Sequence, residues 1–132
     1  NWRKASSKQL KPAHLKQGEA AETACCHYLK AQGLKLVERN FSCRLGEIDL
    51  IMTDKKTLVF VEVRYRKNND FGGGLESITI AKQKKLYKAA ELYLQQNNRY
   101  KNARFDVVSM SKNNQTICDD NDYTYDWIIN AF

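Results

Sequence analysis

The residues of this chain with the clearest chemical potential are acidic side chains that interrupt two strongly apolar segments. Glu47 and Asp49 lie within the segment Gly-Glu-Ile-Asp-Leu-Ile-Met at 46–52, and Glu62 lies within Leu-Val-Phe-Val-Glu-Val-Arg at 58–64. Carboxylates in apolar surroundings are costly unless a positive group satisfies them. Mg²⁺ is such a group, because it takes one or two carboxylates together with oxygens of a substrate phosphate. The pattern therefore favours a site for one or two Mg²⁺ or Mn²⁺ ions.

Strand periodicity predicts which of these side chains share a face. Alternate residues of a strand point to the same side, so Glu47 and Asp49 are expected on one face, with Ile48 and Leu50 on the other. On the second strand, Glu62 shares its face with the arginine two residues later. Both strands thus place their acids on one face.

The turn between the two strands predicts how the acids meet. A turn centred on residues 55–56 sets Asp49 opposite Glu62 and Glu47 opposite Arg64, with directly opposed Cβ atoms about 5 Å apart. A slip of one residue would move Asp49 to the other face. A plainer alternative remains open, in which Glu47 and Arg64 form a cross-strand ion pair that only decorates the sheet.

Two helices and five strands are expected to position these residues. The apolar spacing, turn residues and Gly33 as a helix stop predict the boundaries. The helices are expected at about 15–32 and 80–97, and the strands at 35–43, 47–53, 57–66, 105–110 and 125–129. This order predicts an α/β domain in which an αβββαβ core forms a mixed sheet flanked by helices, with an extra C-terminal strand.

Composition suggests the class of partner. The chain has 132 residues, which suits one domain, and 22 Lys and Arg against 15 Asp and Glu give a net charge of +7. Such a surplus favours a polyanion such as nucleic acid, although a domain that is incidentally basic is the plainer alternative. Residues 1–14 are predicted to form a flexible basic arm before the domain at 15–132.

The same composition argues against other classes. The sequence has no apolar run long enough to span a membrane, so no membrane partner is expected. Its four cysteines show no zinc-site or disulfide spacing, and reduced thiols in a cytoplasmic protein are the expectation.

Several of these segments together resemble a known family. The Gly-Glu-Ile-Asp-Leu-Ile segment is similar to one in the uncharacterised bacterial UPF0102 (YraN-like) family. So are Val-Phe-Val-Glu-Val-Arg-x-Arg at 59–66, Phe-Gly at 71–72, Arg-Phe-Asp-Val-Val at 104–108 and the final Asn-Ala-Phe. That family resembles PD-(D/E)XK nucleases, which have the restriction-endonuclease-like fold, and most closely archaeal Holliday-junction resolvases.

The resemblance implies roles for individual residues. Asp49 corresponds to the metal-binding acid, and Glu62 to the acid of the Glu-x-Lys element. Val63 would offer its backbone carbonyl to the metal. By the resemblance, Glu22 on the first helix would reach the metal or its water. Without the resemblance, Glu22 would be interpreted as a solvated helix glutamate.

One position departs from the superfamily pattern. Arg64 stands where a lysine is usual, and an arginine stays charged and cannot act as a base. It can still orient the attacking water or stabilise phosphate charge. Arg66, Lys82 or Lys85 are the alternatives for the missing lysine.

These features predict a metal-dependent endonuclease that hydrolyses phosphodiester bonds in structured or branched DNA. Catalysis would use Glu22, Asp49, Glu62 and Arg64, and the predicted nucleic-acid contacts are Arg66, Lys82, Lys84, Lys85 and Lys88. The loop at 67–76 could close over the substrate.

The alternative is an inactive nuclease-fold module that binds nucleic acid or a DNA-processing partner, which the arginine at 64 favours. A structural or protein-interaction domain is the weakest hypothesis. Cutting both strands of a junction would need two active sites and hence a homodimer, although the sequence shows no interface signature.

Overall fold

The computed structural model describes residues 13–66, 78–112 and 123–132, with side chains from residue 18 onward. The predicted loop at 67–76 and Cys118 lie outside these residues. So does the predicted basic arm, apart from the two residues that begin the first helix.

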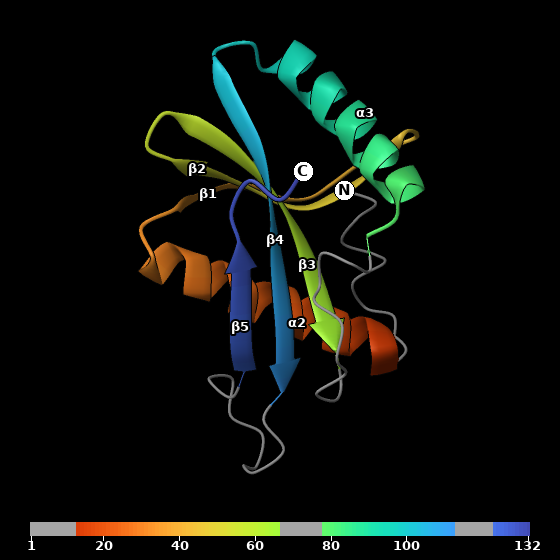
Figure 1. Cartoon of the computed structure of the whole chain (residues 1–132), viewed down its shortest axis with the longest axis vertical. Helices are drawn as coiled ribbons and strands as arrows, with labels where there is room; N and C mark the ends of the chain where they lie inside the picture. The colour runs from red at the N-terminus through yellow and green to blue at the C-terminus, as the bar shows by residue number, and fades with distance from the viewer. Residues whose placement is uncertain (1–12, 67–77, 113–122) are drawn as a thin grey trace, which may run out of the picture.

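The order of elements is the predicted αβββαβ with an extra C-terminal strand (Figure 1). The elements are α2 (Ala13–Ala31), β1 (Lys35–Cys43), β2 (Gly46–Asp54), β3 (Thr57–Arg66), α3 (Ile80–Gln96), β4 (Asn102–Lys112) and β5 (Tyr123–Ile128). The strands form one sheet in the order β1-β2-β3-β4-β5, in which β3 and β4 are parallel and the other neighbours are antiparallel. The predicted α/β class with a mixed sheet is confirmed.

Local residues account for the end of α2 and for the start of α3. Helix α2 is followed by Gly33 at φ +107°, a left-handed conformation in which glycine is favoured. Helix α3 begins after Thr79, whose hydroxyl accepts a hydrogen bond from the Lys82 backbone N–H at 3.1 Å. Neither helix in the described part of the chain is long and apolar enough to cross a membrane.

The sheet carries a hydrophobic core on each face. Under α2, the strands contribute Leu50, Met52, Val59 and Val61. Under α3, they contribute Ile48, Ile51, Leu58 and Phe60. Figure 1 shows α2 crossing the lower part of the sheet and α3 lying beside its upper part.

Strict alternation fails at one place in β2. Ile48 packs in the cluster under α3, whereas Leu50 packs in the cluster under α2. The prediction that these two residues share a face was therefore wrong. Asp49 lies between them, at the point where the alternation of side chains between the two faces of the sheet is interrupted.

The predicted register of the β2–β3 hairpin is confirmed, and it ends beside the acids. Backbone pairing runs from Asp54 opposite Thr57 to Leu50 opposite Val61. One residue further on, the Asp49 side chain accepts a hydrogen bond from the Val63 N–H at 2.9 Å. Since β2 stays paired with β1 and β3 with β4 beyond this point, a side chain here takes the place of a ladder bond between the two central strands.

Candidate metal centre

Glu62, which is buried, and Asp49, which is partly buried, form a carboxyl pair at this junction. The two carboxyl groups lie close enough that each affects the pKa of the other. Glu62 is only 6% exposed. Two acids that meet in a buried place cannot both ionise cheaply without a cation.

The pKa values of the pair reflect this arrangement. Burial, followed by the charge of Asp49, raises the pKa of Glu62 to about 8. Burial also raises the pKa of Asp49, although the hydrogen bonds from Val63 and Glu62 lower it in part. The pair therefore retains a proton at neutral pH and would release it to a divalent cation.

Two cationic side chains approach Glu62. The Lys82 Nζ atom lies 3.7 Å from Glu62 Oε2, and the Arg64 Nη1 atom lies 3.8 Å from the same oxygen. Lys82 comes from the first turn of α3 and Arg64 from β3. Both side chains are partly exposed, so they form the boundary between the carboxyl pair and solvent.

Glu22 approaches from α2 and is not the solvated glutamate of the plainer interpretation. Its side chain is 19% exposed and lies 3.9 Å from Arg39 of β1. Burial and then the charge of Asp49 raise its pKa to about 7. Its Oε1 atom has no hydrogen-bond partner among the described residues.

The donors at this junction fit a hard divalent cation. Asp49 and Glu62 supply carboxylate oxygens. The N–H and C=O of a strand residue point to the same side, so the Val63 carbonyl faces the same gap as its N–H. Among the described residues no group of three or more His, Cys, Asp or Glu side chains lies close enough together to hold a metal. The site is thus a two-carboxylate site with Glu22 nearby, which matches the way Mg²⁺ is commonly held.

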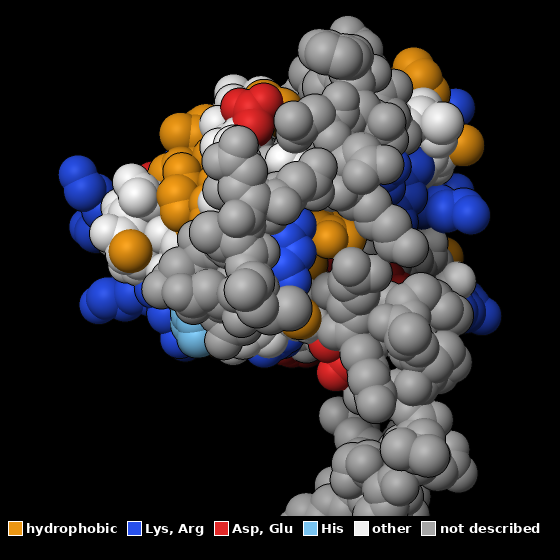
Figure 2. All heavy atoms as spheres, turned by 90° about the horizontal axis from the view of Figure 1, so that it is seen from below, with side chains coloured by type: hydrophobic (Ala, Val, Ile, Leu, Met, Phe, Trp, Pro, Cys, Tyr) orange, Lys and Arg blue, Asp and Glu red, His pale blue; other side chains and the backbone are white. Residues whose placement is uncertain are grey.

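The remaining predicted residues lie around this pair. Glu47 is exposed, and its charge raises the pKa of Asp49. Arg66 at the end of β3 is partly buried, and its Nε has no hydrogen-bond partner among the described residues. The exposed lysines of α3 are Lys84, Lys85 and Lys88. Figure 2 shows Lys and Arg side chains on both flanks of the face seen from below.

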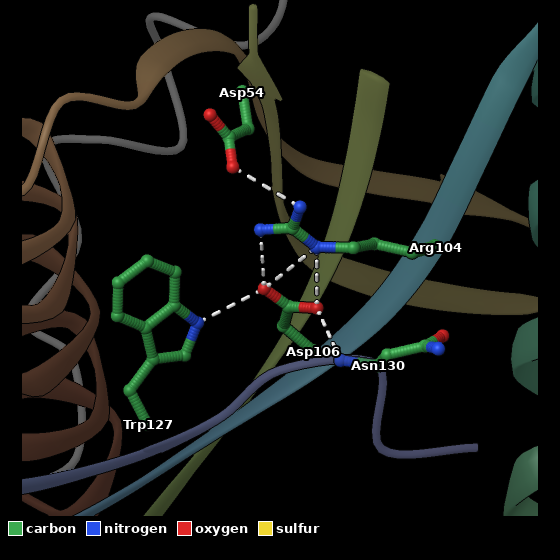
Figure 3. A network of polar contacts seen from close by, with 5 residues as sticks. All are labelled: Asp54, Arg104, Asp106, Trp127 and Asn130. Atoms are coloured by element: carbon green, nitrogen blue, oxygen red, sulfur yellow. Dashed lines mark hydrogen bonds and ion pairs between the residues drawn. The ribbon is translucent and has the colours of Figure 1, made fainter.

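A second buried acid, Asp106 on β4, did not figure among the predicted site residues (Figure 3). Its oxygens accept hydrogen bonds from the Arg104 guanidinium at 3.0–3.3 Å, from the Trp127 indole N–H at 2.9 Å and from the Asn130 backbone N–H at 2.9 Å. Arg104 also pairs with Asp54 at 3.1 Å. Asp106 is therefore fully satisfied by the protein and fastens the C-terminal segment to the sheet.

One hollow of the described surface lies elsewhere. A space of about 450 Å³ between α2 and β5 is lined by residues that include Thr23, His27 and Tyr125, and by none of the paired carboxylates. Its walls are mainly apolar. Because neither Asp49 nor Glu62 lines it, this hollow is separate from the candidate metal centre.

The mixed sheet, the parted central strands and the carboxyl pair define the class of protein, an α/β protein with a restriction-endonuclease-like core. The chain belongs to the family described as "Uncharacterised protein family UPF0102", whose model matches residues 21–110.

Curated relatives cover most of the chain. It is 54% identical to a UPF0102 protein of Nitrosococcus oceani over 77% of this chain and 85% of the relative. It is 47% identical to one of Ectopseudomonas mendocina over 91% and 97%, respectively, and 44% identical to one of Psychromonas ingrahamii over 94% and 95%.

Proposed function

We propose that this protein is a metal-dependent phosphodiester hydrolase that acts on nucleic acid. One observation carries the proposal: the buried Glu62 and the partly buried Asp49 meet at the point where the central strands part, with lysine and arginine side chains beside them. A cluster of this composition is costly to fold and is explained by a cation and a phosphate that bind there.

Asp49, Glu62 and the Val63 carbonyl would hold one or two Mg²⁺ or Mn²⁺ ions. When bound, the metal lowers the pKa of a water molecule and offsets charge on the scissile phosphate. Glu22, whose Oε1 lies 3.9 Å from Arg39 and accepts no hydrogen bond among the described residues, would accept one from a water of that site. Arg64 stays charged and supports the phosphate rather than taking a proton.

The reaction is a nucleophilic displacement at phosphorus by water. A water oxygen forms a bond to phosphorus while the bond from phosphorus to one flanking sugar oxygen breaks. The water releases one proton to solvent, and the departing sugar oxygen takes one up. The products are a phosphate monoester end and a hydroxyl end.

The charge of the chain supports nucleic acid as the substrate. A net charge of +7 and the exposed Lys84, Lys85 and Lys88 of α3 provide contacts for a phosphate backbone. The resemblance to resolvases makes structured or branched DNA in the cytoplasm the substrate to test first, and cutting of both strands would require a homodimer.

A second candidate is a module of the same fold that binds nucleic acid or a DNA-processing partner without cutting. The observation that favours it is Arg64, which forms an ion pair with Glu62 where the superfamily has a lysine. In this case binding would depend on salt, and the carboxyl pair would have no role in it.

The test is cleavage of labelled single-stranded, linear and four-way-junction DNA with Mg²⁺, Mn²⁺ or EDTA. Wild type is expected to cut only with metal, and Asp49→Asn is expected to lose about a thousandfold in rate while it still binds DNA in Ca²⁺. Asp126→Asn, a change of an exposed aspartate on β5, is the matched control and should cut normally. Binding without cutting by wild type would favour the second candidate.

A further inference from the structure

Lys82 differs from the other lysines of α3 in its position. Its ammonium group lies 3.7 Å from Glu62 Oε2, whereas no ion pair with the carboxyl pair is found for Lys84, Lys85 or Lys88 within the described residues. The charge of Lys82 acts on both Asp49 and Glu62. The Lys82 ammonium on α3 therefore faces both carboxyl groups, which come from β2 and β3.

The position of Lys82 is not explained by the stability of its helix. It is the third residue of α3, a helix whose first turn holds no acidic residue. A cation at this end opposes the helix dipole. The helix tolerates the lysine because Glu62 lies opposite, and the lysine in turn brings a mobile donor to the edge of the site.

The close approach of α3 to β2 holds this lysine in place. A Cβ atom at Gly46 would lie only 3.0 Å from the Lys85 backbone oxygen, so a side chain at this position would push the helix away. Gly46 begins β2, three residues before Asp49. The glycine of the Gly-Glu-Ile-Asp segment thus sets the distance between the lysine and the acids.

We propose that Lys82 takes the catalytic place of the strand lysine that Arg64 has replaced. The inference rests on the proposed function. Its ammonium would donate hydrogen bonds to the attacking water and to a non-bridging oxygen of the scissile phosphate, and so stabilise the negative charge that develops there. It acts as a charged donor throughout, with no proton transfer assigned to it.

The two cations beside Glu62 then have different tasks. An ammonium carries three donors on a flexible stem and can follow a water as the reaction proceeds. A guanidinium presents a fixed planar fork that suits a phosphate held in one orientation. Lys82 is thus assigned to the reacting atoms and Arg64 to the substrate backbone.

The test is Lys82→Met, which keeps most of the aliphatic stem, with Lys84→Met as the matched control from the same helix. Lys82→Met is expected to lose about a hundredfold in cleavage rate at saturating DNA. Lys84→Met is expected to weaken only DNA binding. In Lys82→Met, the added substitution Arg64→Lys is expected to restore about tenfold or more, because it returns a lysine to the strand.

A readout without DNA separates this role from a structural one. The rise in Tm on addition of Mg²⁺ should be at least as large in Lys82→Met as in wild type, because removal of a nearby cation favours a divalent ion. Loss of the Mg²⁺ effect would show that Lys82 only maintains the site and would overturn the proposal.

The outcomes distinguish this proposal from the one on which it rests. Cleavage by Lys82→Met within threefold of wild type, alongside an inactive Asp49→Asn, would overturn the role of Lys82 and leave the hydrolase in place. No cleavage by wild type in any metal would overturn both.

Discussion

Asp106 and Glu62 are both buried acids on adjacent parallel strands, yet the rest of the chain treats them differently. Asp106 lies opposite Val61 in the β3–β4 register, one position from Glu62. It accepts hydrogen bonds from Arg104, Trp127 and the backbone of Asn130. Among the described residues, Glu62 lies beside Asp49, another acid, and has two cations at 3.7–3.8 Å.

The comparison teaches how to tell a structural acid from a functional one. The donors around Asp106 are directional and complete, so the protein itself supplies everything that the buried charge needs. Glu62 is left with a raised pKa beside another acid. A buried acid whose hydrogen bonds the chain supplies serves the fold, whereas one without such donors is a candidate for binding a ligand.

The largest expected effect on stability comes from removing Asp106, whose hydrogen bonds the protein supplies. Asp106→Ala removes the buried acceptor of three groups and leaves the partly buried Arg104 side chain without its main partner, which is expected to cost about 3–5 kcal/mol of unfolding free energy. Asp126→Ala, at an exposed position of β5, is the control. Chemical denaturation monitored by circular dichroism measures both. A loss below about 1 kcal/mol would contradict the role given to Asp106.

At the Asp49–Glu62 pair, the contribution to the free energy of unfolding is expected to depend on pH. The pKa of Glu62 in the folded chain is about 8, above its ordinary value of 4.5. Its contribution to stability is therefore full below pH 4.5 and is lost as the pH rises towards 8. Glu62→Gln has no such loss, so relative to wild type it should gain on the order of 1–2 kcal/mol between pH 5 and pH 9.

Denaturation curves without metal at these pH values test this prediction, with the exposed Glu91→Gln as control. Mg²⁺ should stabilise wild type more at pH 9 than at pH 5, because the metal replaces a proton that is already gone at the higher pH. A difference between wild type and Glu62→Gln that does not change with pH would contradict the assignment.

The smallest expected effects are on Mg²⁺ affinity, and they test which side chains around the Asp49–Glu62 pair belong to the site. Glu22→Gln is expected to weaken Mg²⁺ binding about tenfold, because its half-buried carboxylate lies in the field of Asp49 and is placed to hold a bound water. Glu47→Gln should change it less than about threefold, since that side chain is exposed and screened by solvent. Isothermal titration calorimetry compares the two variants. Equal effects would mean that α2 is not part of the site.

The sequence predicted much of this scaffold because its signals are local. The bounds of β1 and β3 were predicted to the residue, and the turn at 55–56 predicted the hairpin register. The helices follow from apolar spacing. Spacing does not separate Lys82 from Lys85, because they lie four residues before the buried Leu86 and Ala89, respectively. Only the contact with Glu62 distinguishes Lys82.

Other features depend on contacts distant in sequence. The Asp106 network joins β4 to the end of β2, to Trp127 in β5 and to Asn130 just after it, and no local pattern gives those partners. The change of face at Asp49 also escaped the period-two rule, because it reflects the parting of β2 from β3 rather than any residue in the strand. The metal, the substrate and the roles of the site residues stay predictions.

The fastening of Asp106 also has a consequence for the order in which the chain folds during synthesis. Arg104 is made soon before Asp106, but Trp127 and Asn130 follow it by 21 and 24 residues. Because a chain can form only contacts to residues already made, Asp106 lacks two of its donors until Trp127 and Asn130 have been added. A chain truncated before Trp127 would therefore hold a loosened sheet, although Asp49 and Glu62 are both present.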